Sequence, residues 1–215
     1  MTADDHSARK DVCVSYARAA AVIWLFGAAV YLVCEAVAAA SPAGYSYIAD
    51  YISDLGAYAV MNVGAFMLHG TLFLLGATVM IRGCPTMGWV GWSFVLAAFV
   101  NAIGNILVGT FHGGSPVVAA HAYWHVVGAG MAILGGNIAV IIAGVGSRGG
   151  GAARNLRRAS IALGSIGIVC LLVLIIDGAN GSHVLPVGLV ERGSVYSIIA
   201  WELMTGVTIL RRPSQ

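Results

Sequence analysis

The stretch AAAVIWLFGAAVYLVCEAVAAA, residues 19–40, decides the class of fold, because Glu35 is its only charged residue. A helix that crosses a membrane needs about 20 mainly apolar residues, so we predict a membrane-spanning helix over 18–40. The apolar run exceeds the about 7–15 residues of a signal-peptide core, so we do not expect a cleaved signal peptide. Five more stretches satisfy the same criterion: 58–81, 88–110, 118–145, 158–177 and 192–210. The sequence therefore predicts an all-α integral membrane protein, a six-transmembrane-helix bundle that forms one domain over 1–215.

The composition excludes a soluble globular protein. The chain of 215 residues is 59% hydrophobic and only 9% charged, whereas soluble domains carry about 25% charged residues. The 29 glycines suit close packing between membrane helices. A net charge of +2 gives no reason to expect a nucleic-acid partner. The cysteines have no metal-type spacing and suggest no disulfide pair; they are Cys13, Cys34, Cys84 and Cys170.

The basic residues predict the orientation in the membrane. Ten of the eleven Lys and Arg residues precede the first predicted helix, follow the last one, or lie between helices 2 and 3 or 4 and 5. Cytoplasmic loops carry the excess of Lys and Arg, so both termini should be cytoplasmic. The eleventh, Arg192, lies on the outer side with the loops 41–57, 111–117 and 178–191.

Polar residues gather on this outer side and are the candidate ligand-binding residues: Ser53, Asp54, His112, His121, Glu191 and Arg192. In SDLGA (53–57), Ser53 or Asp54 is suited to cap the start of the second helix. Arg192, as the one outer cation, should pair with Asp54, Glu35 or Glu191. Two interpretations remain open, namely that these residues latch the outer loops together, or that Arg192 holds an anionic lipid headgroup.

The stretch HAYWH places His121 and His125 one helical turn apart, on the same face of a helix. They are possible metal ligands together with Asp54, and zinc would need a third ligand of this kind. Haem would need two histidines on facing helices. In this sequence, His69 is the histidine on another helix that would face His121 or His125. The alternative is that both histidines lie in the interfacial belt beside Tyr123 and Trp124.

Another set of polar residues falls within the predicted spans: Asn62, His69, Asn101, Asn105, Asn137 and Glu202. Ionisable groups in the membrane are costly and usually face the interior of the bundle. Glu202, near the middle of the last helix, is either a hydrogen-bonded structural carboxyl or a proton-relay or ligand group. The same two interpretations apply to His69.

Three motifs resemble, in order, those of the uncharacterised prokaryotic membrane family catalogued as domain of unknown function 998. They lie in SPAGYSYIADYISDLGAYAVMN (41–62), VGTFHGGSPVVAAH (108–121) and VGLVER (187–192). The matching residues are Pro42, Tyr45, Ser46, Ile52, Ser53, Leu55, Gly56, Asn62, Gly109, Phe111, His121, Gly188, Leu189, Glu191 and Arg192. The sequence departs from the family at FHGG (111–114), where the usual acidic residue is absent. The resemblance implies a six-helix membrane fold and brings no established activity.

We expect a multi-pass protein of the cell membrane with an extracytoplasmic polar pocket. The expected role is binding or handling a lipid or amphiphile, or acting as an accessory to other membrane proteins, with membrane lipids as partners. One alternative is a metal-assisted intramembrane hydrolase that uses His121, His125 and carboxylates. Another is a small transporter with Glu202, Asn101, Asn105 and His69 along its path. No cofactor is expected; zinc belongs to the hydrolase alternative, and nothing further in the sequence supports haem.

Overall fold

The computed structural model is a helical bundle and describes residues 3–84, 88–112, 119–147, 151–180 and 185–211. Within these ranges there are helices and loops but no strand. The elements are α1 (Ala3–Ala39), the 3-10 helix η1 (Ile52–Ala57), the π-helix η2 (Met61–Leu68), α2 (His69–Gly83), α3 (Gly88–Thr110), α4 (Ala119–Gly146), α5 (Gly151–Asn180) and α6 (Val187–Leu210).

Within the described residues, six segments are long and apolar enough to cross a membrane, which confirms the predicted fold class. They are Asp11–Ala39, Met61–Gly83, Gly88–Thr110, His121–Gly146, Ala153–Asn180 and Val187–Leu210. The predicted helix over 58–81 consists of η2 and α2 joined end to end. The last helix begins at Val187, five residues before the predicted start, so Glu191 and Arg192 lie inside the helix.

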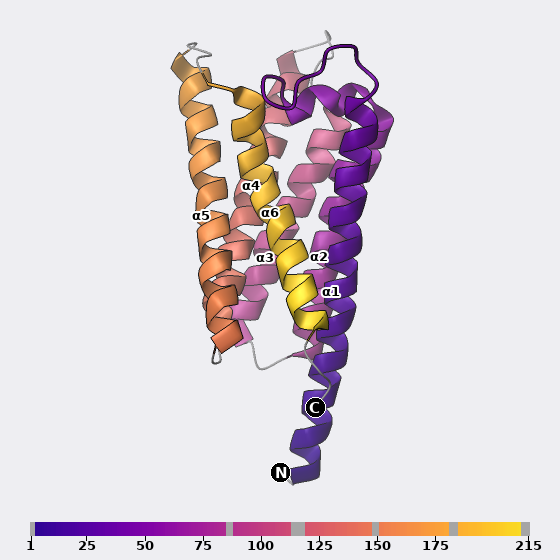
Figure 1. Cartoon of the computed structure of the whole chain (residues 1–215), viewed down its shortest axis with the longest axis vertical. Coiled ribbons are helices and arrows are strands. Elements are labelled where there is room, and N and C mark those ends of the chain that lie inside the picture. The colour runs from indigo at the N-terminus through magenta and orange to yellow at the C-terminus, as the bar shows by residue number, and fades with distance from the viewer. Residues whose placement is uncertain (1–2, 85–87, 113–118, 148–150, 181–184, 212–215) are drawn as a thin grey trace.

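The helices stand side by side, and each packs against its neighbours in the chain (Figure 1). α6 completes the bundle because it packs against α1 as well as α5. The start of α1 and the end of α6 lie at the same end of the bundle (Figure 1). We call this the basic end, because it carries Arg18, Arg82, Arg154, Arg157, Arg158 and Arg211. Two of the arginines used to predict orientation, Arg148 and Arg212, lie outside the described residues.

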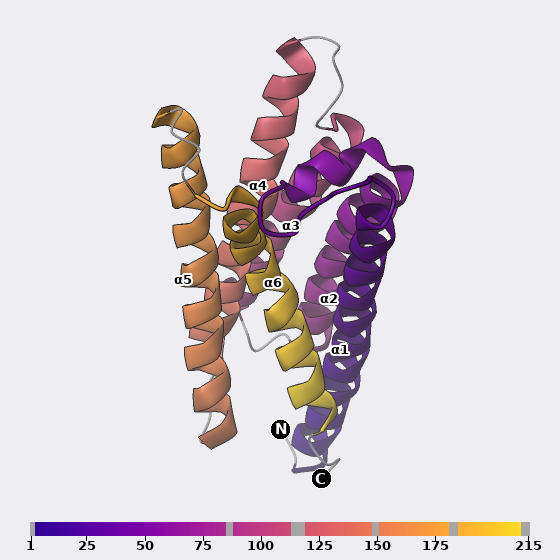
Figure 2. The same ribbon diagram turned by 45° about the horizontal axis from the view of Figure 1, so that its top comes forward.

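We call the opposite end the acidic end. It carries Glu35, Asp50, Asp54, Asp177 and Glu191. The segment between α1 and η2 crosses the bundle at this end and lies over the first turns of α6 (Figure 2). This crossing segment brings residues that are far apart in the sequence into one polar cluster.

The core of the bundle contains four aromatic rings in edge-to-face contact. Trp24, Phe73, Phe94 and Trp201 come from four different helices, with ring centroids 5.0–6.2 Å apart. Edge-to-face pairs are favoured because the positive edge of one ring meets the negative face of the next. This cluster fills the bundle between the two ends.

Cys13 and Cys84 form a disulfide at the basic end. The expectation of no disulfide pair was therefore wrong, because the bond joins residues 71 positions apart, and spacing in the sequence carries no sign of such a contact. The bond links α1 to the residue that follows α2. Cys34 and Cys170 are free.

Candidate functional site

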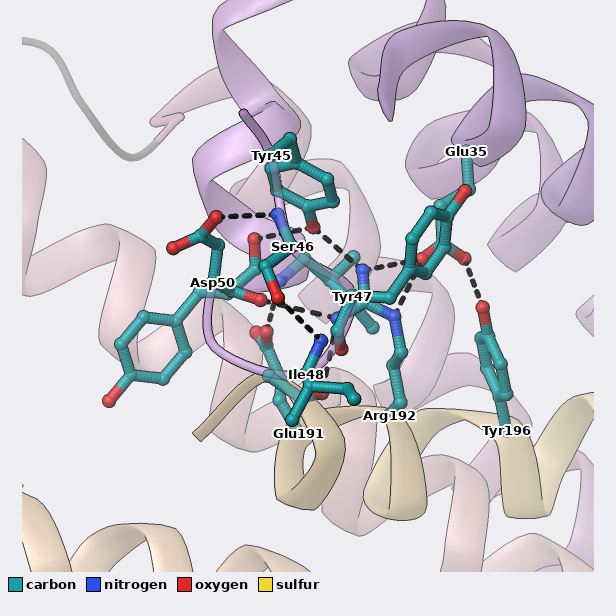
Figure 3. A network of polar contacts seen from close by, with 12 residues as sticks. Glu35, Tyr45, Ser46, Tyr47, Ile48, Asp50, Glu191, Arg192 and Tyr196 are labelled. Atoms are coloured by element: carbon teal, nitrogen blue, oxygen red, sulfur yellow. Dashed lines mark hydrogen bonds and ion pairs between the residues drawn. The ribbon is translucent and has the colours of Figure 1, made fainter. Parts of the chain in front are cut away.

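The buried guanidinium of Arg192 is the centre of the polar cluster at the acidic end (Figure 3). Nε donates to Oε1 of Glu35 at 3.1 Å, and Nη2 forms an ion pair with the same oxygen at 2.9 Å. Glu35 is 1% exposed and also accepts a hydrogen bond from the Tyr196 hydroxyl at 2.8 Å. This ion pair joins α6 to α1, and it confirms one of the three partners predicted for Arg192.

The remaining donors of Arg192 hold the crossing segment. Nη1 donates to the carbonyl oxygens of Tyr47 (2.7 Å), Asp50 (3.2 Å) and Gly188 (3.1 Å), and Nη2 donates to the Tyr45 hydroxyl at 2.6 Å. The guanidinium also lies 4.4 Å from the centroid of the Tyr47 ring, a cation–π contact. Each of the three guanidinium nitrogens therefore donates to an acceptor within the protein. This arrangement favours the latch interpretation over an Arg192 that holds a headgroup.

The crossing segment approaches α6 closely at Gly188. A Cβ atom at this position would lie 3.0 Å from both the Asp50 nitrogen and the Ile48 carbonyl oxygen. The Leu189 amide donates to that same Ile48 oxygen at 3.1 Å. The glycine of the VGLVER motif therefore allows the crossing segment to pack directly against α6.

Glu191 binds η1 from the neighbouring helix. Its Oε2 accepts a hydrogen bond from the amide of Ile52, the first residue of η1. A carboxylate in this place satisfies an amide that the start of a helix leaves unpaired. Ser53 and Asp54 lie inside η1, and no side chain caps it at Tyr51. The predicted cap of the second helix was wrong, because that helix begins with η2, which has no side-chain cap at Val60. The acid at the start of η1 comes from 139 residues away.

Asp54 is the exposed acid of η1. Partial burial of its carboxyl raises its pKa above the ordinary value of 3.8, while a backbone hydrogen bond and the nearby His125 oppose that rise. Burial likewise raises the pKa of the tyrosines of the crossing segment, Tyr45, Tyr47 and Tyr51.

The histidines of HAYWH have separate surroundings. The His121 ring is exposed and meets the Phe111 ring edge to face at 5.6 Å. His125 is half-buried, and its Nδ1 lies 2.8 Å from the Phe111 carbonyl oxygen. His112 is exposed. Among the described residues, no three His, Cys, Asp or Glu side chains lie where they could hold a metal ion. His183, another outer-side histidine, lies outside the described residues.

A narrow cavity of about 50 Å³, which we call the acidic-end cavity, runs from this cluster into the bundle. Its rim includes Ser53, His125 and Glu191, which are all partly exposed. Its deeper polar lining consists of Tyr31, His69, Asn101 and Asn105. The rest of its wall is apolar: Ile52, Phe66, Val108, Ala129, Ala132, Ile133, Val195 and Ile198. The cavity therefore joins candidates from the outer set to candidates from the predicted spans.

Four of the six polar residues within the spans form two pairs. Nε2 of His69 lies 2.8 Å from Oε2 of Glu202, and both side chains are buried. The Asn101 amide donates to the Ala132 carbonyl at 2.6 Å, and Asn105 donates to Asn101 at 3.0 Å. Asn62 does not lie at mid-depth as expected, because it is the second residue of its span and donates to the Gly56 carbonyl at 2.7 Å.

Asn137, the last of these residues, joins α4 to α6. It donates to the Ser194 carbonyl at 2.9 Å and accepts a hydrogen bond from the Ser197 hydroxyl at 2.7 Å. Asn137, Ser194 and Ser197 are all buried. Interhelical hydrogen bonds of this kind hold membrane helices together, so we assign Asn137 a structural role.

Six apolar helices around a buried polar centre define a multi-pass helical membrane protein. The chain belongs to the family described as "Protein of unknown function (DUF998)", whose profile matches residues 25–208. This match confirms the family that the three motifs indicated. No curated protein and no solved structure matches the chain.

Proposed function

We propose that the chain binds the polar end of a cationic amphiphile at its acidic end, while the apolar part of the ligand stays in the membrane. The observation that supports this function is the acidic-end cavity, with Ser53, His125 and Glu191 at its rim and apolar walls below. Binding sites for small molecules combine mainly apolar walls with a few placed polar groups. A cavity of about 50 Å³ is far below the about 300–1,000 Å³ of drug-sized sites, so it suits an end group and not a whole lipid.

The charge of the acidic end supports a cation. Among the described residues, five acidic residues lie there with one arginine, and each guanidinium nitrogen of Arg192 already donates to the protein. Surfaces lined by one sign of charge concentrate ligands of the opposite sign. This argument replaces the anionic headgroup considered from the sequence alone with a protonated or quaternary amine.

The test compares two amphiphiles with the same alkyl chain, dodecyltrimethylammonium and dodecyl phosphate, on the protein in neutral-lipid nanodiscs. We expect the ammonium compound to bind at least about tenfold more tightly, which corresponds to about 1.4 kcal/mol. Glu191→Gln should remove most of that preference, because the amide oxygen still accepts from Ile52 while the charge is lost. Asp11→Asn, at the opposite end, is the matched control. Equal binding of both amphiphiles, or an unchanged preference in Glu191→Gln, would contradict the proposal.

One observation favours a second candidate function, a small transporter. A cavity of about 350 Å³ lies at the basic end, beside Cys13, Cys84, Ser147 and Thr205. Trp24, Phe94 and Trp201 of the aromatic cluster also line it. Cavities at both ends of a bundle suit alternating access to a central site. Proteoliposomes that swell faster in small polar solutes than empty liposomes would support transport, and equal rates would oppose it.

A further inference from the structure

The pair formed by His69 and Glu202 is the most buried ionisable group in the interior of the spans. His69 is 3% exposed and Glu202 is 0% exposed, with Nε2 and Oε2 2.8 Å apart. Two further atoms of the pair, His69 Nδ1 and Glu202 Oε1, are buried without a hydrogen-bond partner. Because buried polar atoms are normally paired, these two atoms need an explanation that packing does not supply.

Water molecules in the acidic-end cavity would supply the missing hydrogen-bond partners. His69, Tyr31 and Asn101 all line it, and the Tyr31 hydroxyl and the Asn101 Oδ1 also lack partners. A water molecule needs roughly 10–15 Å³ of such space and two to four polar partners. The cavity of about 50 Å³ therefore fits a short file of about three water molecules.

We propose that His69 and Glu202 form a proton-binding site within the membrane, which takes up its proton from the acidic end through water in the acidic-end cavity. The cavity rim is partly exposed at Ser53, His125 and Glu191, and its deep end is lined by His69. The site therefore has a path from the surface to one member of the pair, with Glu202 directly behind it.

The transfer conserves protons and charge. At the start, neutral His69 carries its proton on Nε2 and donates it to the Glu202 carboxylate, which leaves the Nδ1 lone pair free. A hydronium in the cavity gives a proton to Nδ1, and the imidazolium then releases its Nε2 proton to Oε2 of Glu202. The products are one water molecule, a neutral histidine protonated on Nδ1 and a neutral carboxylic acid. The site has gained one proton, and a costly buried charge has been removed.

Few other titratable groups face the pair. From α1, the Tyr31 ring lies 5.2 Å from the His69 ring, and Gly27 packs beside both members. α3 contributes only the amides of Asn101 and Asn105, while α4 and α6 contribute His125 and Glu191 at the far rim of the cavity. None of the described residues that line the cavity is lysine or arginine. Among the described residues, the pair and Tyr31 are therefore the titratable groups at the deep end of this path.

The acidic-end and basic-end cavities share no lining residue among those described. On α6, Ile198 lines the acidic-end cavity and Thr205 lines the basic-end cavity, with Glu202 between them. The Trp24 and Trp201 rings, whose centroids are 5.0 Å apart, stand on the basic-end side. In this conformation, the site should exchange protons with the acidic end alone.

The experiment follows the carboxyl group of Glu202 by infrared difference spectroscopy on the protein in nanodiscs, as the pH is lowered from about 8 to about 5. We expect a protonated-carboxyl C=O band that is absent in Glu202→Gln and retained in Glu191→Gln. A band that persists in Glu202→Gln, or no band in the native protein, would overturn the proposal.

A second measurement tests the path rather than the site. After a rapid pH drop, Tyr31→Phe should slow the appearance of the band several-fold, because it removes one of the partners of the cavity water but keeps the ring. Tyr16→Phe, at the basic end, should leave the rate unchanged. An unchanged rate in Tyr31→Phe would exclude uptake through this cavity. The infrared band is independent of amphiphile binding, so either proposal can fail without the other.

Discussion

The contacts of Arg192 explain why the otherwise acidic end of the bundle contains one positive charge. Its guanidinium is 5% exposed and joins α1, the crossing segment and α6 through hydrogen bonds whose acceptors all belong to the protein. A buried charge is tolerated when its partner and its hydrogen bonds are in place. The residue therefore assembles the rim of the cavity and is not free to bind a ligand.

The first prediction concerns Glu35, the partner of Arg192. Glu35→Gln leaves Arg192 buried without a counter-charge, which typically costs about 3–5 kcal/mol, so the free energy of unfolding in detergent should fall by that order. Asp11→Asn removes one exposed acidic charge and should change it by no more than about 0.5 kcal/mol. Similar losses in both variants would mean that the buried pair contributes little.

The second prediction concerns the pH dependence that Asp54 produces. Partial burial raises the pKa of its carboxyl above 3.8, so the folded protein holds this proton more tightly than the unfolded chain does. Stability should therefore fall as the pH rises from 3.8 through the raised pKa. Thermal unfolding of the native protein and of Asp54→Asn across this interval measures the effect. The fall should be smaller in the variant, and identical curves would contradict this assignment.

At the scale of elements, α3 and α4 touch backbone to backbone. A Cβ at Gly104 would lie 2.6 Å from the Gly128 carbonyl oxygen, and a Cβ at Gly135 would lie 2.7 Å from the Asn101 nitrogen. Small residues allow such contact between membrane helices. This close contact also positions Asn101, whose side chain donates to α4 at Ala132.

The third prediction tests this helix contact. Gly104→Ala should lower the free energy of unfolding by about 1–3 kcal/mol, the usual cost of overpacking. Gly130→Ala is the matched control within the same helix pair, because a Cβ there would meet nothing within 4 Å. We expect the control to be neutral or slightly stabilising, since alanine favours helix more than glycine does. Equal destabilisation by both would point to a general effect of glycine replacement.

At the scale of the whole molecule, the ten basic residues outside α6 predict that the acidic end faces away from the cytoplasm. The fourth prediction uses single cysteines in a variant that lacks the four native ones. Ser41→Cys, in the exposed start of the crossing segment, should react with a membrane-impermeant maleimide on intact cells. Asn155→Cys, exposed at the basic end, should react only after permeabilisation. The reverse pattern would invert the orientation.

The fold could be predicted from the sequence more fully than the site could. The number and approximate ends of the spans follow from apolar length, a property of each segment by itself. The start of α6 at Val187 was missed because Glu191 and Arg192 looked like a boundary, whereas Glu191 binds η1 and Arg192 is buried against the crossing segment. The cap of η1 by Glu191 and the Cys13–Cys84 bond were missed because they depend on contacts between distant segments. The pairing of His69 with Glu202 is likewise a tertiary contact. The sequence nevertheless indicated both residues as candidates, because an ionisable group within a membrane span is costly.

The central claim of this account is that the acidic-end cavity holds water within the membrane. The most direct test is an experimental structure of the protein in lipid nanodiscs, at a resolution that shows ordered water. We predict density in the cavity within hydrogen-bond distance of the Tyr31 hydroxyl, His69 Nδ1 and Asn101 Oδ1, three atoms without partners that belong to residues lining the cavity. A cavity filled by side chains, with those three atoms bonded to protein groups, would contradict it.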